Sequence, residues 1–297
     1  MDAEFIMPDF LAGYDIYKYF YKLTNEYPEI LIPNSKIYTI FGIFDNCLWN
    51  GGGYFFGNSI RREQAKEIID FYNYELKIPL TFTFTNPMLK KQHYEDTYSN
   101  MIAEVGHNGK NCILVSDLEF EKYLRNTYPN YKYCRSIIAT EYEPYALSSK
   151  YGPYAISVMQ RKKNNDWKYL DTIPITDRQF IEFLCNDTCP DNCPRLYSHY
   201  KVLGQEQIEF TEQLDGHSCT MKPPLAQIFP YYYITHNLKT YISRRMIDEE
   251  YLPRGFCKFK CSGRGSSLNI IVNILDYLIK DEYRIDVLGL MLSHIMS

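Results

Sequence analysis

Three cysteines stand close together in the second half of the chain, where the sequence reads Cys185-Asn-Asp-Thr-Cys189-Pro-Asp-Asn-Cys193. Thiols spaced four residues apart in a segment rich in turn-forming residues can be directed at one point. Thiolates prefer soft metals, and this pattern therefore predicts a zinc ion or an iron–sulfur cluster. A disulfide between Cys189 and Cys193, or a set of ordinary buried thiols, are the alternatives.

A metal site of this kind needs a fourth ligand. Cys219 lies further along the same polar segment and can reach back, so the ligands that we predict are Cys185, Cys189, Cys193 and Cys219. Cys47 and His199 are alternatives for one position. The third clustered cysteine comes one residue too late for the C-x3-C-x2-C spacing of radical-SAM enzymes, which excludes that class.

A second kind of site is suggested by an arginine between glycines near the end of the chain, Cys261-Ser-Gly-Arg264-Gly. The glycines let the backbone approach a ligand, and the N-terminus of the helix that follows can hold an anion. A surface salt bridge is the alternative for this arginine. Asn50 follows an early strand, and we expect Asn50 and Arg264 to orient an anionic or polar substrate.

The elements that must position these residues alternate between strand and helix patterns. Strands are predicted at residues 37–44, 79–85, 111–115, 133–139, 155–159, 180–184, 231–235 and 256–261. Eight strands, mostly followed by helices, predict a (β/α)8 TIM-like barrel. An open doubly wound sheet is the alternative, which we disfavour because neither a G-x-G-x-x-G sequence nor a P-loop follows a strand.

This prediction makes residues 37–297 a single barrel domain and residues 1–36 a segment that packs on it. The barrel is degenerate in the middle, and a long loop carries the cysteines after the sixth strand. Active sites of such barrels lie at the carboxyl ends of the strands. We therefore expect the cysteines, Asn50 and Arg264 to meet at that end.

Amino-acid composition and charge indicate which broad class of protein this chain belongs to. Of the 297 residues, 45% are hydrophobic and 23% charged, as in globular chains, and the net charge of −4 does not indicate a nucleic-acid-binding face. The sequence has neither an apolar run long enough for a membrane span nor a secretory signal. Nine cysteines without an export signal indicate reduced thiols, and we expect a cytoplasmic protein.

Two short motifs resemble the collagenase-like peptidase family U-32. Members typically show a C-x3-C-R pair and a late F-K-I-x-G-R strand; the corresponding residues here are Cys189-x3-Cys193-Pro-Arg195 and Phe259-Lys-Cys-Ser-Gly-Arg264. The resemblance implies a (β/α)8 barrel. It also implies a 4Fe-4S cluster held by four cysteines, as in the relatives that hydroxylate ubiquinone precursors or RNA bases without oxygen. It does not imply proteolysis.

The resemblance carries over residue by residue only in part. Cys189 and Cys193 match directly, and Cys219 corresponds to a later family cysteine, whereas the earlier one usually lies further upstream than Cys185. A proline also separates Cys193 from Arg195, where the family often has none. Arg195 belongs to the matched motif and is a third candidate for substrate binding.

Two functions follow as hypotheses. The first is a metal-dependent enzyme, with an iron–sulfur cluster at the barrel mouth, that acts on a small or RNA-borne organic substrate. The second is a non-catalytic barrel whose cysteines hold a structural zinc and whose 29 tyrosines supply a surface for a protein partner.

Overall fold

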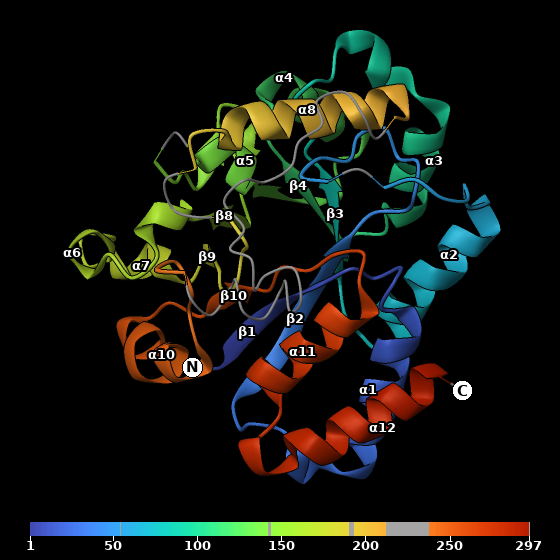
Figure 1. Ribbon diagram of the computed structural model, residues 1–297. Coiled ribbons are helices and arrows are strands. Elements are labelled where there is room, and N and C mark those ends of the chain that lie inside the picture. Colours follow the sequence, from blue (N-terminus) through green and yellow to red (C-terminus); the bar gives the residue numbers. More distant parts are fainter. Residues whose placement is uncertain (54, 142–143, 190–192, 212–237, 297) are drawn as a thin grey trace.

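Eight parallel strands close into a barrel in the computed structural model, which describes residues 1–53, 55–141, 144–189, 193–211 and 238–296 (Figure 1). The order around the barrel is β1-β10-β9-β8-β5-β4-β3-β2. The predicted (β/α)8 TIM-like barrel is confirmed. The strands are β1 (Ala3–Pro8), β2 (Ser35–Gly42), β3 (Leu80–Phe84), β4 (Cys112–Val115), β5 (Lys132–Arg135), β8 (Ile156–Val158), β9 (Ile181–Leu184) and β10 (Lys258–Lys260).

The N-terminal segment differs from the sequence prediction, because β1 is itself a barrel strand. It pairs with β2 and β10 on its two sides, with Phe5 opposite both Ile37 and Phe259. Its partners are remote in the sequence, so its six residues give only a weak local pattern. The predicted strand 231–235 lies outside the described residues. Because β9 pairs directly with β10, the barrel closes with eight strands without it.

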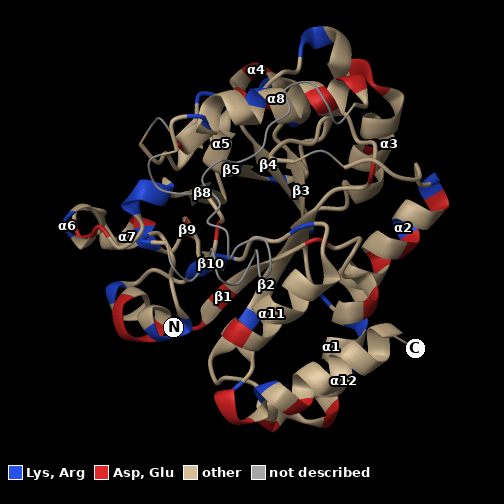
Figure 2. Ribbon diagram, viewed as in Figure 1, with Lys and Arg blue, Asp and Glu red and all other residues tan. Residues whose placement is uncertain are grey.

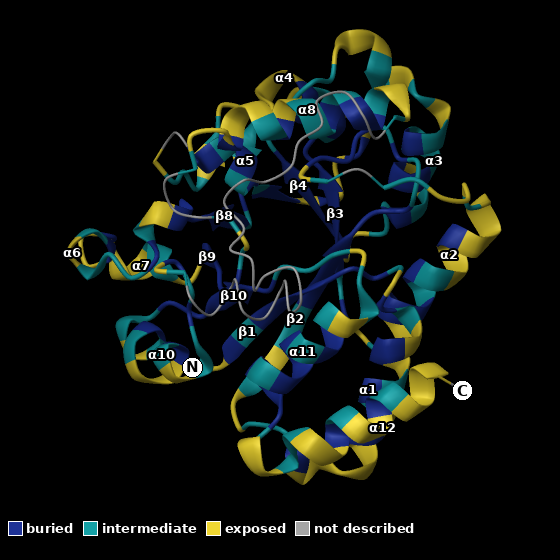
Figure 3. Cartoon of the chain, in the orientation of Figure 1, coloured by how far each residue is buried: buried dark blue, intermediate teal, exposed yellow. Residues whose placement is uncertain are grey.

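Helices surround the barrel, with their apolar faces turned to the strands and their exposed faces outward (Figure 3). Short helices follow β5 and β8, which agrees with the predicted degenerate middle. No helix in the described ranges is long and apolar enough to cross a membrane. The helices are α1 (Tyr14–Glu26), α2 (Arg62–Asp70), α3 (Thr97–Gly106), α4 (Leu118–Thr127), α5 (Ile137–Thr140), α6 (Trp167–Leu170), α7 (Ile175–Arg178), α8 (Leu196–Glu209), α10 (Arg244–Met246), α11 (Ser267–Leu278) and α12 (Arg284–Met296). A small antiparallel pair, β6 (Ser148–Ser149) and β7 (Gly152–Pro153), stands apart.

The two faces of β10 have opposite chemistry. Phe259 packs outward against Phe5, Phe183 and Tyr251. Because side chains alternate along a strand, Lys258 and Lys260 point into the barrel, and β10 carries basic segments there (Figure 2). Glutamates on the flanking strands balance both lysines. The interior of the barrel is therefore charged as well as apolar.

Helix α8 lies in the segment that the sequence predicts as a long loop. Its backbone packs against the loops after β2 and β3: the Asn86 side chain donates to the Gly204 carbonyl (2.9 Å), and the Gln207 side chain accepts from the Phe55 amide (2.8 Å). Its buried residues include Gly204, Glu206 and Gln207. Because this inner face is polar, hydrophobic periodicity does not reveal the helix.

Candidate active site at the barrel mouth

A cavity of about 490 Å³ opens at the carboxyl ends of the strands. Its floor comes from strand residues such as Thr83, Leu114, Leu184 and Lys260, and α8 forms one wall. This is the position at which barrel enzymes carry their active sites. The charged residues that line it are Arg161, Asp187, Lys260 and Arg264, together with His199 and Tyr200 of α8.

Arg264 follows β10 and lies in the cavity wall beside the loop after β2. Its guanidinium donates to the side chains of Asn50 (3.1 Å) and Thr83 (3.0 Å) and to the Gly51 carbonyl (3.1 Å). All three acceptors are neutral, and in the described chain no carboxylate forms an ion pair with this guanidinium. Burial lowers the pKa of Arg264 to about 10, which leaves it charged at neutral pH. The cavity thus contains a partly buried cation that forms no ion pair with a carboxylate of the described residues.

Asn50 fixes this arginine and does not itself line the cavity. It is fully buried, and its amide nitrogen donates to the Gly53 carbonyl (2.7 Å). Its side-chain oxygen accepts from both Thr83 (2.8 Å) and Arg264. The structure therefore brings the two predicted residues together, with Asn50 as a positioning residue and Arg264 as the group that faces the cavity.

Asn50→Asp is expected to weaken the binding of an organic anion by about tenfold, because a carboxylate beside Arg264 neutralises the guanidinium. Titration calorimetry with the variant and the wild type measures this change. Asn46→Asp is the matched control, because Asn46 lies in the same loop and bonds Gly57 and Ser59 instead. Equal affinity in the wild type and Asn50→Asp would contradict this role of Arg264.

The loop that carries Arg264 is held by a buried amide pair. Asn186 donates to Asn273 (2.6 Å) and accepts from the Ser262 amide (2.7 Å), and Asn273 donates to the Ser262 carbonyl (2.7 Å). The Gly265 amide, two residues before α11, donates to the Asp9 carboxylate (2.7 Å). In the first turn of α11 the Asn269 amide donates to the Ser266 hydroxyl (3.4 Å), so the helix N-terminus predicted to hold an anion has a serine cap of this chain.

Arg161 is the second cation of the cavity and lies in a charged network. It donates to the Asp187 carboxylate and to the Tyr200 hydroxyl, and its Nη1 lies 3.5 Å from a Glu141 oxygen. Neither that nitrogen nor that oxygen has a hydrogen-bond partner among the described residues. Burial raises the pKa of the Glu141 carboxyl, and the Arg161 charge opposes that rise. This network joins the loop after β8 to α8.

Lys260 is the third cation and ends β10. Its Nζ lies 4.0 Å from the centre of the Phe41 ring and 3.8 Å from a Glu182 oxygen, which has no hydrogen-bond partner among the described residues. Burial lowers the pKa of Lys260, the Glu182 charge opposes that fall, and the Arg264 charge adds to it. Burial also raises the pKa of Glu182. Both shifts favour the neutral forms of this pair.

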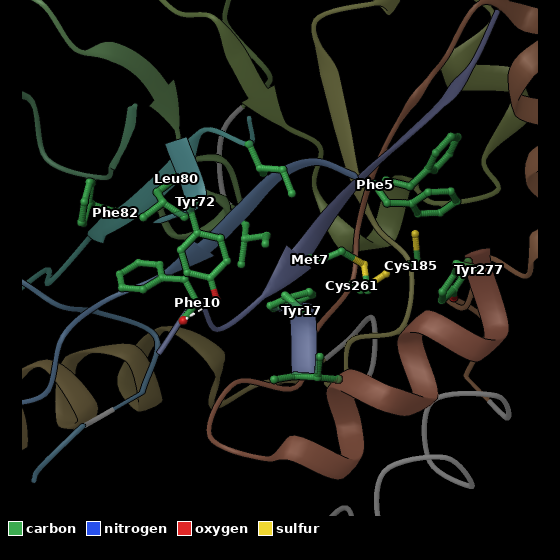
Figure 4. Close-up of a cluster of buried hydrophobic side chains, with 14 of the residues drawn as sticks. Phe5, Met7, Phe10, Tyr17, Tyr72, Leu80, Phe82, Cys185, Cys261 and Tyr277 are labelled. Carbon is green, nitrogen blue, oxygen red and sulfur yellow. Dashed lines mark hydrogen bonds between the residues drawn. The ribbon is translucent and has the colours of Figure 1, made fainter. Parts of the chain in front are cut away.

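Cys185 does not lie with Cys189 and Cys193, the other predicted ligands that the structure describes. Figure 4 shows it among Phe5, Met7 and Tyr277, beside Cys261, in the layer between the barrel and its helices. Cys185 is fully buried, and burial raises the pKa of its thiol well above the ordinary value. A thiol that stays protonated in an apolar layer is a poor metal ligand.

The remaining candidate metal ligands lie in different parts of the fold. Cys189 lines the cavity, and Cys193 packs with it against the apolar cluster of Ile138 and α8. Cys47 is buried beside Ser99, and burial raises the pKa of its thiol to about 12. Cys219 lies outside the described residues. His199 lines the cavity, and no three metal-binding side chains gather within the described ranges, so the metal site, which includes Cys219, stays a prediction.

Cys185→Ala is expected to leave the metal content of anaerobically purified protein equal to that of the wild type, because this thiol points into the core. Metal analysis of both proteins measures it, with Cys261→Ala as the matched control from the same layer. A loss of bound metal in Cys185→Ala but not in Cys261→Ala would show that Cys185 is a ligand.

Arg195, the third predicted substrate-binding residue, is exposed at the N-terminus of α8 and is not part of the cavity lining. Arg161, Lys260 and Tyr200 are functional candidates that sequence reasoning missed. The sequence could have indicated Lys260, because side chains alternate along a strand and its neighbour Phe259 is the apolar, outward-facing residue. Arg161 lies in a polar segment without periodicity, and nothing local in the sequence indicates its burial.

Comparison with known proteins was made for sequence and for structure. No family model matches the sequence, and no curated protein matches it. A solved structure described as the U32 peptidase Mk0906 matches with a TM-score of 0.50 over 90% of this chain and 94% of that one, at 8% sequence identity. The chain has a U32 peptidase-like fold. At this identity the likeness describes the barrel and its connections alone.

Proposed function

We propose that this chain is an enzyme that binds a small organic anion at the barrel mouth and acts on it there. The observation that carries the proposal is Arg264, a partly buried guanidinium that lines the cavity and donates to three neutral acceptors in place of a carboxylate. Burial of an unpaired charge is costly, and an anionic ligand offsets that cost. Barrel enzymes commonly hold anionic groups at this end.

The rest of the lining suits the same class of ligand. Arg161 and Lys260 add two cations, whereas Asp187 is the one carboxylate among the lining residues that the structure describes. Phe41, Phe55 and Ile138 supply an apolar surface for a carbon skeleton. A cavity of about 490 Å³ is of the size that small-molecule sites have.

Thermal unfolding with a panel of ligands tests this proposal. The panel pairs carboxylates and phosphate monoesters with neutral amides and alcohols of the same carbon skeleton. We expect some anions to raise the melting temperature and the neutral compounds with the same carbon skeleton to leave it unchanged. A ligand at 100 times its dissociation constant adds about 2.7 kcal/mol to the free energy of unfolding. A panel in which neutral partners stabilise as well as the anions would contradict the proposal.

A thiolate-bound metal beside this cavity is the second candidate, favoured by the position of Cys189 in the cavity wall. An iron–sulfur cluster there would supply one-electron chemistry, including the oxygen-independent hydroxylation that the U-32 resemblance implies. The visible spectrum and metal content of anaerobically purified protein test it. A brown protein that contains iron supports it, and a colourless protein without iron overturns it.

The protein-binding alternative has less support from the described residues. Several tyrosines are fully buried in the core, among them Tyr17, Tyr72 and Tyr277. Among the described residues the exposed tyrosines are Tyr27, directly after α1, Tyr74, shortly after α2, and Tyr197 on α8. The tyrosine content therefore serves packing first, and a protein partner stays a prediction.

A further inference from the structure

We infer that Lys260 is a nucleophile that joins a carbonyl-bearing organic anion as an imine, with Glu182 as its proton partner. The inference rests on the proposed function, because Arg264 would hold the anionic group of the same molecule. It names the substrate class as small oxo acids, which carry an aldehyde or ketone beside a carboxylate.

The position of Lys260 gives its amine access to such a ligand. The residue ends β10, its side chain is 9% exposed, and it lines the cavity four residues before Arg264. The Phe41 ring covers one side of the ammonium at 4.0 Å, and the carboxylate that it faces lies 3.8 Å away, too far for a hydrogen bond. The amine thus lies in the cavity wall, paired with a carboxylate that is too distant for a direct hydrogen bond.

Glu182 supplies the group that a lysine nucleophile needs. Its buried Oε1 faces Lys260 and accepts no hydrogen bond in the described chain. Burial lowers the pKa of the amine and raises that of the carboxyl, so the proton passes more readily from Lys260 to Glu182 than it would in water. A neutral amine in an apolar, cationic surrounding is the reactive form in lysine catalysis.

The step balances with these two groups and the ligand alone. The Lys260 ammonium gives a proton to the Glu182 carboxylate, and the neutral amine adds to the carbonyl carbon as a proton moves from nitrogen to oxygen. The C–O bond of this adduct then breaks, and the protonated Glu182 returns its proton to the leaving hydroxyl, which departs as water. The product is a protonated imine beside an ionised Glu182, with no change in oxidation state.

Lys258 provides an internal comparison on the same strand. It also points into the barrel, but it donates to the Glu4 carboxylate and lies over the Tyr38 ring, at 4.2 Å from its centre. It is not part of the cavity lining. Because Lys258 is hydrogen-bonded to a carboxylate and has no access to the cavity, we expect it not to form an imine with the ligand. Comparison of Lys258 with Lys260 therefore distinguishes imine formation in the cavity from the general reactivity of lysine side chains.

Reductive trapping with glyoxylate and cyanoborohydride on the full chain tests the inference. Peptide mass spectrometry then locates carboxymethyl groups on each lysine. We expect Lys260 to be modified at a glyoxylate concentration about tenfold lower than Lys258 or any exposed lysine requires. Glycolate, the carboxylate that has an alcohol in place of the aldehyde, should compete with glyoxylate for the cavity. Lys260→Arg should remove the preferred adduct. Modification of Lys260 no faster than that of exposed lysines would overturn the inference.

The same experiment separates this inference from the proposed function. If glycolate binds the wild type and not Arg264→Met, while glyoxylate leaves Lys260 unmodified, the anion site stands and the imine is wrong. If glyoxylate modifies Lys260 equally well in the wild type and Arg264→Met, the lysine is the nucleophile and the anion site proposed around Arg264 is wrong. Lys260→Arg keeps the charge, and its melting temperature shows whether the variant is folded.

Discussion

Replacement of Arg264 by methionine is expected to weaken the binding of an organic anion by about 100-fold. A desolvated, charge-assisted bond to a carboxylate or phosphate is worth more than a neutral hydrogen bond, and methionine has neither the charge nor the donors. The fold should tolerate the change, because the acceptors left behind, Asn50 and Thr83, still bond each other. Titration calorimetry with the best anion of the panel measures the dissociation constants.

Arg245→Met is the matched control for this experiment. It removes the same charge from a side chain that is 81% exposed on α10, where its partner is Glu249 one turn away. We expect the anion affinity of Arg245→Met to equal that of the wild type. The affinity of Arg264→Lys, which keeps a charge without the planar fork, should lie between those of the wild type and Arg264→Met. If both methionine variants lose the same modest affinity, the effect is net charge and the cavity is not the site.

Arg161→Met is expected to lower the free energy of unfolding by about 3–5 kcal/mol, the cost typical of an uncompensated buried charge. The substitution leaves Asp187 and Glu141 without their cation, and Glu141 is 5% exposed. Tyr200 loses its partner as well. Urea denaturation at neutral pH measures this difference.

The double variant Arg161→Met with Glu141→Gln separates lost charge pairing from lost packing. It removes one of the two stranded carboxylates, so it should recover part of the loss. Lowering the pH should also favour Arg161→Met relative to the wild type, because protonation neutralises the stranded Glu141, whose pKa is already raised by burial. A double variant as unstable as Arg161→Met, at both pH values, would show that the loss comes from packing alone.

Local pattern was enough to predict β3, in which phenylalanine and threonine alternate, and β4, whose side chains are apolar on both faces. It was not enough for β1, whose identity as a barrel strand depends on partners about 30 and 250 residues away. Helix α8 was missed for a different reason, since its buried face carries Gly204 and Gln207 in contact with backbone groups.

For the site, position relative to the strands was a better guide than spacing along the chain. Asn50 and Arg264 both follow strands, and the barrel brings them to 3.1 Å. The even spacing of the cysteines does not place Cys185 beside Cys189, because Cys185 continues the alternation of β9 and shares the outward face of Phe183. Arg161 depends on two carboxylates and a tyrosine hydroxyl from three separate segments, which no local pattern contains.

A crystal structure of the protein with the best anion of the panel tests the central claim most directly. We predict that the carboxylate or phosphate of the ligand lies within hydrogen-bond distance of the Arg264 guanidinium, with its carbon skeleton against Phe55 and its remaining polar groups toward Lys260 and Arg161. An anion bound elsewhere on the molecule, with water alone against Arg264, would contradict the account.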